Sequence, residues 1–147
     1  MNFCTHFDCN YLPHALSLAN SLSRNLNSFN LFLICMDDTS FKYLESNRPE
    51  NSIPIHFTEM ENYFKDLKTA KQNRNRIEYF FTCTPAVCNY IIKNNKGIDF
   101  LTYLDSDLYF FSSPQVIFDE IGEKSISIIE HRFNWITSRQ RKFGIYN

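Results

Sequence analysis

Residues 97–114 read GIDFLTYLDSDLYFFSSP: an apolar run, a D-S-D triplet, a second apolar run and a Ser-Pro pair. The first run, 98–104, predicts a buried strand because it is short, apolar and preceded by a glycine. Ser113 and Pro114 are typical of a helix start and predict a helix that ends near Gly122. A strand that leads into a helix is the repeating unit of α/β folds.

The rest of the chain alternates strands and helices in the same way. The predicted strands are 2–6, 31–36, 53–57, 98–104 and 125–129, and the predicted helices are 10–26, 40–46, 84–95 and 113–122. The polar segment 59–76 predicts a solvated helix and loop. This alternation predicts an α/β fold with a mostly parallel sheet flanked by helices. At 147 residues, we expect 1–147 to form a single domain.

Charge and hydropathy exclude two classes of protein. The chain has 15 Lys and Arg against 16 Asp and Glu, a formal net charge of −1, which provides no basic field for nucleic acid. Apolar runs such as 31–36 are too short to cross a bilayer. The first ten residues show no basic segment followed by an apolar one, so we expect a cytoplasmic protein.

Glycines and cysteines exclude further site types. Three glycines supply neither a G-x-G-x-x-G motif nor a P-loop, which argues against dinucleotide oxidoreductases and P-loop NTPases. Five cysteines without a C-x-x-C pair argue against zinc or redox motifs. We expect the cysteines to be small buried hydrophobic residues.

Polar groups follow the predicted strands. Ligands of parallel sheets bind beyond the carboxyl ends of the strands. The candidate groups are residues 5–11 after the first strand, Asp37 and Asp38 after the second, Asp105 and Asp107 after the fourth, and His131 and Arg132 after the fifth. Asp38 could instead cap the following helix. We expect most of these groups to converge on one edge.

Asp105 and Asp107 stand between two apolar runs, which predicts two carboxylates held beside a core. Two like charges so close repel each other unless a cation lies near them. Mg²⁺ or Mn²⁺ would meet that need and leave positions open for phosphates, whereas capping or salt bridging is the alternative. A bound pyrophosphate would also need cations such as Arg74 or Arg76, as glycosyl transfer from a nucleoside diphosphate requires.

Four blocks of sequence carry a resemblance to a known family. They are FCTHFDCNYLPHALSLANSL (3–22), RIEYFFTCTP (76–85), LTYLDSDLYFFSSPQVIFDEI (101–121) and SISIIEHRF (125–133). In this order they resemble the GT-A fold glycosyltransferases, in particular bacterial family-8-like nucleotide-diphospho-sugar transferases. The resemblance implies a Rossmann-like fold and a hexosyltransferase-like enzyme. It would move a sugar from a UDP- or GDP-linked donor to a saccharide acceptor, with Mn²⁺ or Mg²⁺ bridging the donor diphosphate and the D-x-D carboxylates.

The same resemblance implies roles for single residues. Asp107 is a metal ligand, and Asp105 shares the metal or contacts the ribose. The implied nucleotide-sugar contacts are Thr5, Phe7, Asp8, Asn10, Tyr11, Asp37, Arg76 and Asp105. His131 would position the acceptor or the donor sugar as the catalytic candidate. Packing of Tyr11 on the first helix, a solvated Arg76 and a structural His131 are the alternatives, while His6, His14 and His56 are interpreted as packing or surface residues.

The segment KFGIYN, 142–147, resembles the beginning of a further strand in that family. The resemblance therefore implies an amino-terminal, donor-binding half, whose exposed apolar surface would favour self-association. Family habit implies a surface polysaccharide or lipopolysaccharide as acceptor. The alternative is a non-catalytic nucleotide-binding or interaction module with the same fold, and a phosphohydrolase that uses the two aspartates is disfavoured.

Overall fold

The computed structural model describes residues 1–124 and 127–128. The chain divides into two compact units, Met1–Ser113 and Pro114–Asn147. In the second unit, α6 (Gln115–Ile121) follows Pro114 and ends at Gly122, which has a positive φ of 51°. This helix confirms the prediction made from the Ser-Pro pair, to within two residues at its start. Among the described helices, none is long and apolar enough to cross a membrane.

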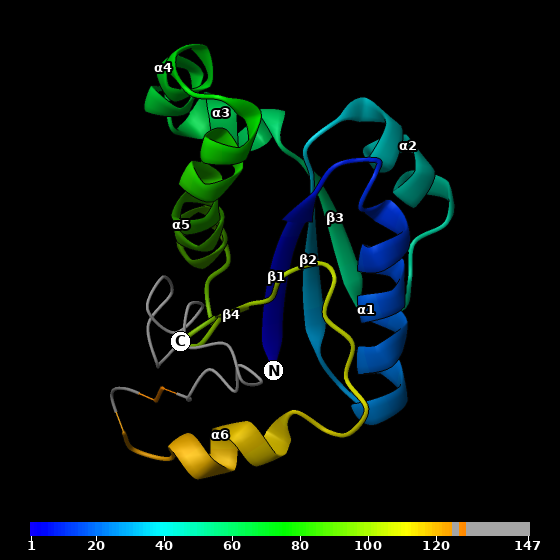
Figure 1. The fold of residues 1–147 in the computed structure, drawn as a ribbon. Helices are drawn as coiled ribbons and strands as arrows, with labels where there is room; N and C mark the ends of the chain where they lie inside the picture. The colour runs from blue at the N-terminus through cyan, green and yellow to red at the C-terminus, as the bar shows by residue number, and fades with distance from the viewer. Residues whose placement is uncertain (125–126, 129–147) are drawn as a thin grey trace, which may run out of the picture. The chain divides into compact units, whose positions relative to one another are not determined.

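A parallel sheet forms the centre of the first unit (Figure 1). Its strands are β1 (Asn2–Phe7), β2 (Asn30–Cys35), β3 (Ser52–His56) and β4 (Thr102–Tyr103), in the order β3-β2-β1-β4. Every pairing is parallel, with Phe7 opposite Cys35 and Cys4 opposite Tyr103. The α/β fold class predicted from the sequence, with a mostly parallel sheet flanked by helices, is confirmed.

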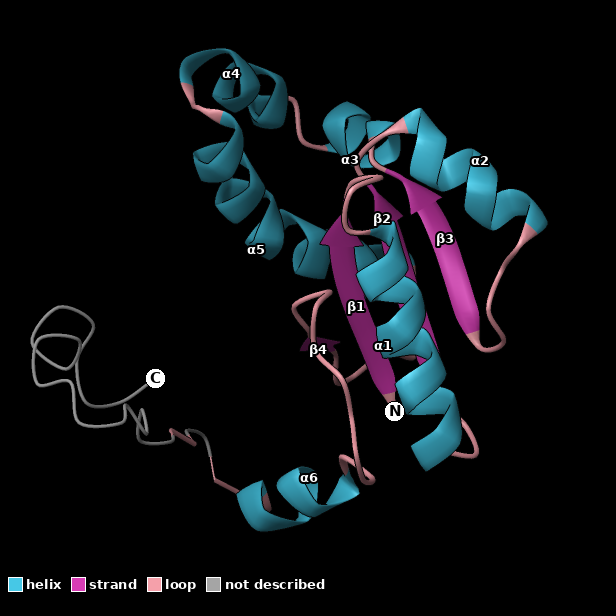
Figure 2. Cartoon of the chain, turned by 45° about the vertical axis from the view of Figure 1, so that its right-hand side comes forward, coloured by secondary structure: helices cyan, strands magenta, loops and turns pink. Residues whose placement is uncertain are grey.

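Helices cover both faces of this sheet. The connections β1–β2 and β2–β3 contain α1 (Leu12–Asn25) and α2 (Asp38–Ser46). The connection from β3 to β4 contains α3 (Thr58–Tyr63), α4 (Asp66–Asn73) and α5 (Arg76–Asn94). Figures 1 and 2 show α1 on one side of the sheet and α5 on the other. β1 therefore has β2, the next strand in the chain, on one side and β4, the last of the four, on the other.

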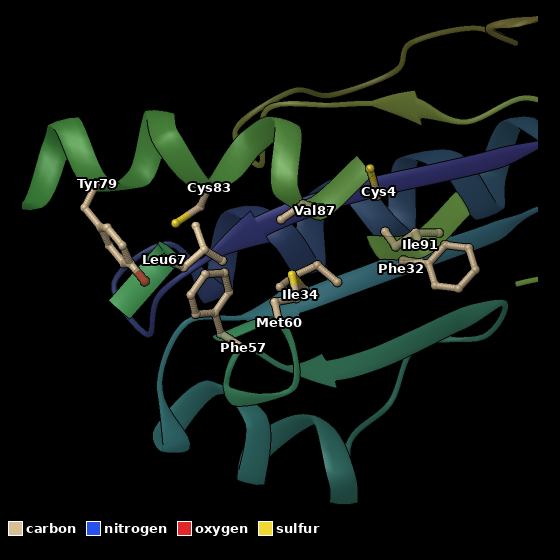
Figure 3. Close-up of a cluster of buried hydrophobic side chains, with 10 residues drawn as sticks. All are labelled: Cys4, Phe32, Ile34, Phe57, Met60, Leu67, Tyr79, Cys83, Val87 and Ile91. Atoms are coloured by element: carbon tan, nitrogen blue, oxygen red, sulfur yellow. The ribbon is translucent and has the colours of Figure 1, made fainter. Parts of the chain in front are cut away.

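Strand alternation divides the core between the two faces. Cys4, Phe32 and Ile34 face the side of α5 and form one buried cluster with residues of the third to fifth helices (Figure 3). Those helical members are Met60, Leu67, Tyr79, Cys83, Val87 and Ile91, and Phe57 completes the cluster. Along β1 and β2 nearly every side chain is buried, which is typical of central strands in parallel sheets.

Two predicted boundaries are wrong. The predicted strand 98–104 is reduced to Thr102–Tyr103, because Asp99 and Phe100 are exposed and only the end of the run pairs with β1. The helix predicted to start at Thr84 and Pro85 begins earlier, at Arg76, so that Pro85 lies inside α5. The predicted strand 125–129 falls largely outside the described residues.

The polar segment 59–76 forms most of two short helices, α3 and α4, and the first residue of α5. The expectation that it is solvated and outside the core is wrong in part, because Met60 and Leu67 are buried in the core cluster. Of the cysteines, Cys4, Cys35 and Cys83 are buried and Cys88 is half-buried, as expected. Cys9 is exposed, against expectation, because it lies in the loop after β1 rather than on a strand or helix face.

Candidate functional site

A cavity of about 740 Å³ lies beyond the carboxyl ends of β1 and β4. These two strands mark the switch point of the sheet, because the chain continues from β1 toward β2 on one side and reaches β4 on the other. The cleft at such a point is where ligands of open parallel sheets bind. Three segments line the cavity: the end of β1 with the following loop, the first half of α5, and the D-x-D segment after β4.

The loop after β1 supplies Asp8, Asn10 and Tyr11 to the cavity. The Asp8 carboxylate is buried and accepts hydrogen bonds from the backbone N–H groups of Asn10 (2.9 Å) and Tyr11 (3.3 Å). This turn leads the chain directly into α1. The half-exposed Tyr11 ring lines the cavity and lies 5.4 Å from the His14 ring, so it both faces the cavity and packs on the helix.

Arg76 reaches the same cavity from the first residue of α5. Its guanidinium forms an ion pair with Asp8 and lies 5.8 Å from the centre of the Phe80 ring. The Arg76 side chain is 65% exposed, whereas that of Asp8 is 10% exposed. The cation at the mouth of the cavity is therefore held by a buried carboxylate rather than freely solvated.

The D-x-D segment places both acids on the cavity side. Leu104 and Ser106 are buried, while Asp105 and Asp107 are exposed and line the cavity. The two carboxylates stand beside buried neighbours, as expected, but they are not themselves buried: the alternation leaves both acids exposed to solvent, which weakens their repulsion. Within the described part of the chain, neither carboxylate forms a hydrogen bond or an ion pair.

His6 belongs to this site although it was interpreted as a packing or surface residue. It is nearly buried, lines the cavity and shares a 3.1 Å hydrogen bond between its Nδ1 and the Tyr103 hydroxyl. Burial lowers the pKa of His6. A hydrogen bond to the Phe80 backbone and the negative charge of Asp105 act in the opposite direction but are outweighed, so the neutral ring is favoured. Burial also raises the pKa of Tyr103 to about 12, so its hydroxyl stays protonated.

Thr5 does not line the cavity. It is fully buried, and its hydroxyl has no hydrogen-bond partner among the described residues. Successive side chains of a strand point to opposite faces, so Thr5 lies on the face away from His6. Period-two alternation counted back from Asp8 was the signal that would have selected His6 in place of Thr5. Phe7 is also buried, and part of it lines the cavity.

Asp37 lies outside the main cavity and caps α2. Its carboxylate accepts hydrogen bonds from the backbone N–H groups of Ser40 (2.8 Å) and Cys9 (2.6 Å). Partial burial raises the pKa of Asp37, but these hydrogen bonds outweigh it and hold the pKa below its ordinary value. Asp38, the alternative cap, instead bonds the Nε2 of His56 at 2.9 Å.

Asp37 lines a second cavity of about 380 Å³. This cavity shares Asp8, Arg76 and Phe80 with the main one, so the ion pair stands between the two. Lys71 and Arg74 add positive charge to the second cavity. His131 and Arg132 lie outside the described residues.

The donor set suits a hard divalent cation. Among the residues with described positions, no three His, Cys, Asp or Glu side chains are grouped closely enough to hold a metal. Mg²⁺ and Mn²⁺, however, need only one or two protein carboxylates when substrate phosphates and water complete their shell. Asp105 and Asp107, two exposed carboxylates on one wall of a cavity, fit that requirement.

Comparison with known proteins finds relatives but no family. No family model matches the chain. The chain is 28% identical over 131 residues to the uncharacterized protein YfnD of Bacillus subtilis, a match that covers 89% of this chain and 42% of that protein. It is 27% identical over 154 residues to the uncharacterized protein YfnF of the same organism, with 99% and 50% covered. The chain thus spans half the length, or less, of these two relatives.

Proposed function

We propose that this chain binds the nucleotide-sugar donor of a metal-dependent glycosyltransferase. The observation that carries the proposal is the main cavity at the switch point. It brings together the Arg76 guanidinium, aromatic rings, and the Asp105 and Asp107 carboxylates, which have no partner among the described residues. A cation is what a diphosphate requires, carboxylates are what a divalent metal ion requires, and aromatic rings are what a nucleobase requires. The cavity volume falls within the range of roughly 300 to 1,000 Å³ that small-molecule sites occupy.

Each wall has a role in this proposal. Tyr11 and Phe80 offer ring faces for a base, and Asn10 offers an amide to its edge. Arg76 would bind a phosphate once the diphosphate competes with Asp8 for it. Asp105 and Asp107 would hold Mn²⁺ or Mg²⁺. When bound, that ion would neutralise negative charge that builds up on the departing nucleoside diphosphate.

The neutral His6 and the protonated Tyr103 are hydrogen-bonded to each other and line the cavity together with Asp105. Neither adds charge to the cavity, so the D-x-D carboxylates and the ion pair set its electrostatics. In this proposal, a saccharide acceptor approaches from the open side. The five cysteines are free thiols, in keeping with a reducing cytoplasm.

Titration calorimetry with UDP or GDP in the presence of Mn²⁺ tests the proposal. We expect one nucleotide to bind and Asp107→Asn to weaken it at least tenfold, since a charge-assisted contact is worth about 1.5 to 3 kcal/mol. Asp99→Asn is the matched control, because Asp99 is exposed and lies outside the cavity.

The outcomes separate the candidate functions. Metal-dependent binding together with sugar transfer or donor hydrolysis supports an enzyme. The same binding without turnover supports a non-catalytic nucleotide-binding module. If neither nucleotide binds, or if Asp107→Asn binds as tightly as the wild type, both readings of the cavity fail.

A further inference from the structure

Two thiols from distant parts of the sequence meet beside the cavity. The Sγ atoms of Cys4 and Cys88 lie 4.0 Å apart and share a hydrogen bond, although 84 residues separate them along the chain. Cys4 belongs to β1 and Cys88 to α5. Figure 3 shows Cys4 on β1 beneath α5. Among the described residues, no other two of the five cysteines have sulfur atoms in contact, so only this pair there is placed to react together.

The two thiols differ in access and in acidity. Cys4 is fully buried, whereas Cys88 is half-buried. The hydrogen bond between the two thiols lowers the pKa of Cys88, although burial opposes this. The same hydrogen bond, and then burial, raise the pKa of Cys4. Cys88 is thus the nucleophile and Cys4 its neighbouring, protonated partner.

We infer that Cys88 and Cys4 form a reversible intramolecular disulfide when the protein meets a peroxide. The Cys88 thiolate attacks one peroxide oxygen, the O–O bond breaks, and Cys88 becomes a sulfenic acid. The hydroxide that leaves takes up the proton that the Cys88 thiol gave to solvent and becomes the first molecule of water. The Cys4 sulfur then attacks the Cys88 sulfur and displaces hydroxide, which takes up the Cys4 proton and leaves as water. In sum, two thiols lose two electrons and one hydrogen peroxide becomes two molecules of water.

The geometry allows this bond and gives it a consequence. The sulfur atoms need to approach from 4.0 Å to about 2.0 Å to form the bond. His6, two residues after Cys4, and Thr84, one helical turn before Cys88, both line the main cavity. The disulfide would therefore tie together two elements that line the cavity.

The remaining cysteines lack one requirement or another. Burial raises the pKa of Cys35 to about 12 and that of Cys83 to about 11, so both stay protonated. Cys9 is exposed, but it has no thiol neighbour among the described residues. Cys9 is therefore the internal control for non-specific oxidation.

The test is peptide mapping of the whole reduced chain after brief treatment with equimolar hydrogen peroxide and alkylation of the remaining thiols. We expect one disulfide-linked peptide pair that contains Cys4 and Cys88, in a monomer, and its disappearance after dithiothreitol. Cys9→Ser should leave this pair unchanged. Cys4→Ala should abolish this peptide pair, because the partner thiol is gone.

The inference is overturned if Cys4 and Cys88 stay reduced, and are therefore alkylated, while Cys9 is oxidised. It is also overturned if the disulfide joins two chains, or if Cys88 of the wild type accumulates as a sulfinic acid. The wild-type map alone yields each of these outcomes, so a variant that fails to fold does not block the test. The result is independent of nucleotide binding.

Discussion

The Asp8 carboxylate makes two kinds of contact, one with the backbone of its own loop and one with the side chain of Arg76. It fixes the loop after β1 through the Asn10 and Tyr11 backbone, and it also holds the Arg76 guanidinium. An asparagine at this position keeps an oxygen for the backbone N–H groups but loses the charge. Asp8→Asn therefore isolates the effect of the ion pair on anion binding.

We expect Asp8→Asn to bind pyrophosphate with Mn²⁺ about twofold to fivefold more tightly than the wild type. Arg76 is largely exposed, so its ion pair is worth about 0.5 to 1 kcal/mol, and that competition disappears. Calorimetry with pyrophosphate measures this without a nucleoside. Asp38→Asn, which breaks the exposed pair with His56, should leave the affinity unchanged. Weaker binding in Asp8→Asn would show that Arg76 does not serve the anion.

Asp37 provides a prediction of pH dependence. Hydrogen bonds hold its folded pKa below the ordinary value of 3.8, so its contribution to stability is present above that pH and is lost as the pH falls through the folded pKa. At neutral pH, Asp37→Ala should lower the free energy of unfolding by about 1 to 2 kcal/mol through loss of the helix cap. Urea unfolding at several pH values measures both effects.

The difference between wild type and Asp37→Ala should shrink below pH 3.8. Glu45→Ala serves as the comparison, because Glu45 is exposed on the same helix. A difference that stays constant down to about pH 2 would mean that the Asp37 charge does not contribute.

At the level of single residues, the sequence predicted most of the side chains that line the cavity but not the contacts between them. Asp8, Asn10, Tyr11, Asp105 and Asp107 all line it, because strand ends in a parallel sheet share one edge, and Arg76 reaches it from the start of α5. The sequence predicts Thr5 in this site and His6 outside it, whereas strand alternation along β1 places His6 at the cavity and Thr5 on the opposite face of the sheet. The Arg76–Asp8 pair joins residues 68 apart and has no local signal.

At the level of elements, α5 begins at Arg76 rather than at the predicted Thr84. Proline is favoured in the first turn of a helix, so Thr84 and Pro85 predicted a helix start. The true start has its own signal, a capping box in which Asn75 accepts from the Glu78 N–H and Glu78 from the Asn75 N–H. A proline inside a helix removes one hydrogen bond, and packing of Cys83, Val87 and Ile91 into the core compensates.

We expect Pro85→Ala to raise the free energy of unfolding by about 1 to 3 kcal/mol. Pro85 is exposed, and alanine restores the N–H that can bond the Phe81 carbonyl. Chemical denaturation measures the change. Asn89→Ala, at another exposed position of α5, should raise it by less than 1 kcal/mol. An equal or smaller effect of Pro85→Ala would show that the surrounding packing requires the proline ring.

The short β4 has a related explanation. An apolar run predicts burial, but the number of ladder pairs depends on the neighbouring strand, which only the tertiary structure supplies. β4 pairs only Thr102 and Tyr103 with β1, and the Leu104 N–H extends the ladder by one bond to Cys4. These few bonds are enough to direct Asp105 and Asp107 to the cavity.

At the level of the whole molecule, strand order determines where the cavity forms. Because β4 joins the sheet beside β1 rather than beside β3, the first loop and the D-x-D segment become neighbours although about 100 residues separate them. The alternation of strands and helices predicted a parallel sheet, but it could not give the order β3-β2-β1-β4, which depends on long-range pairing. The relatives in Bacillus subtilis extend beyond the matched region, so transfer activity and acceptor remain proposals.

The most direct measurement is electron paramagnetic resonance of Mn²⁺, titrated into the protein with and without UDP or GDP. We predict that the wild type removes free Mn²⁺ from solution more strongly when the nucleotide is present, because metal and diphosphate stabilise each other. The double variant Asp105→Asn/Asp107→Asn should lose this effect, while Asp99→Asn keeps it. Equal Mn²⁺ binding by the wild type and the double variant, with the nucleotide present, would contradict a metal site at these two aspartates.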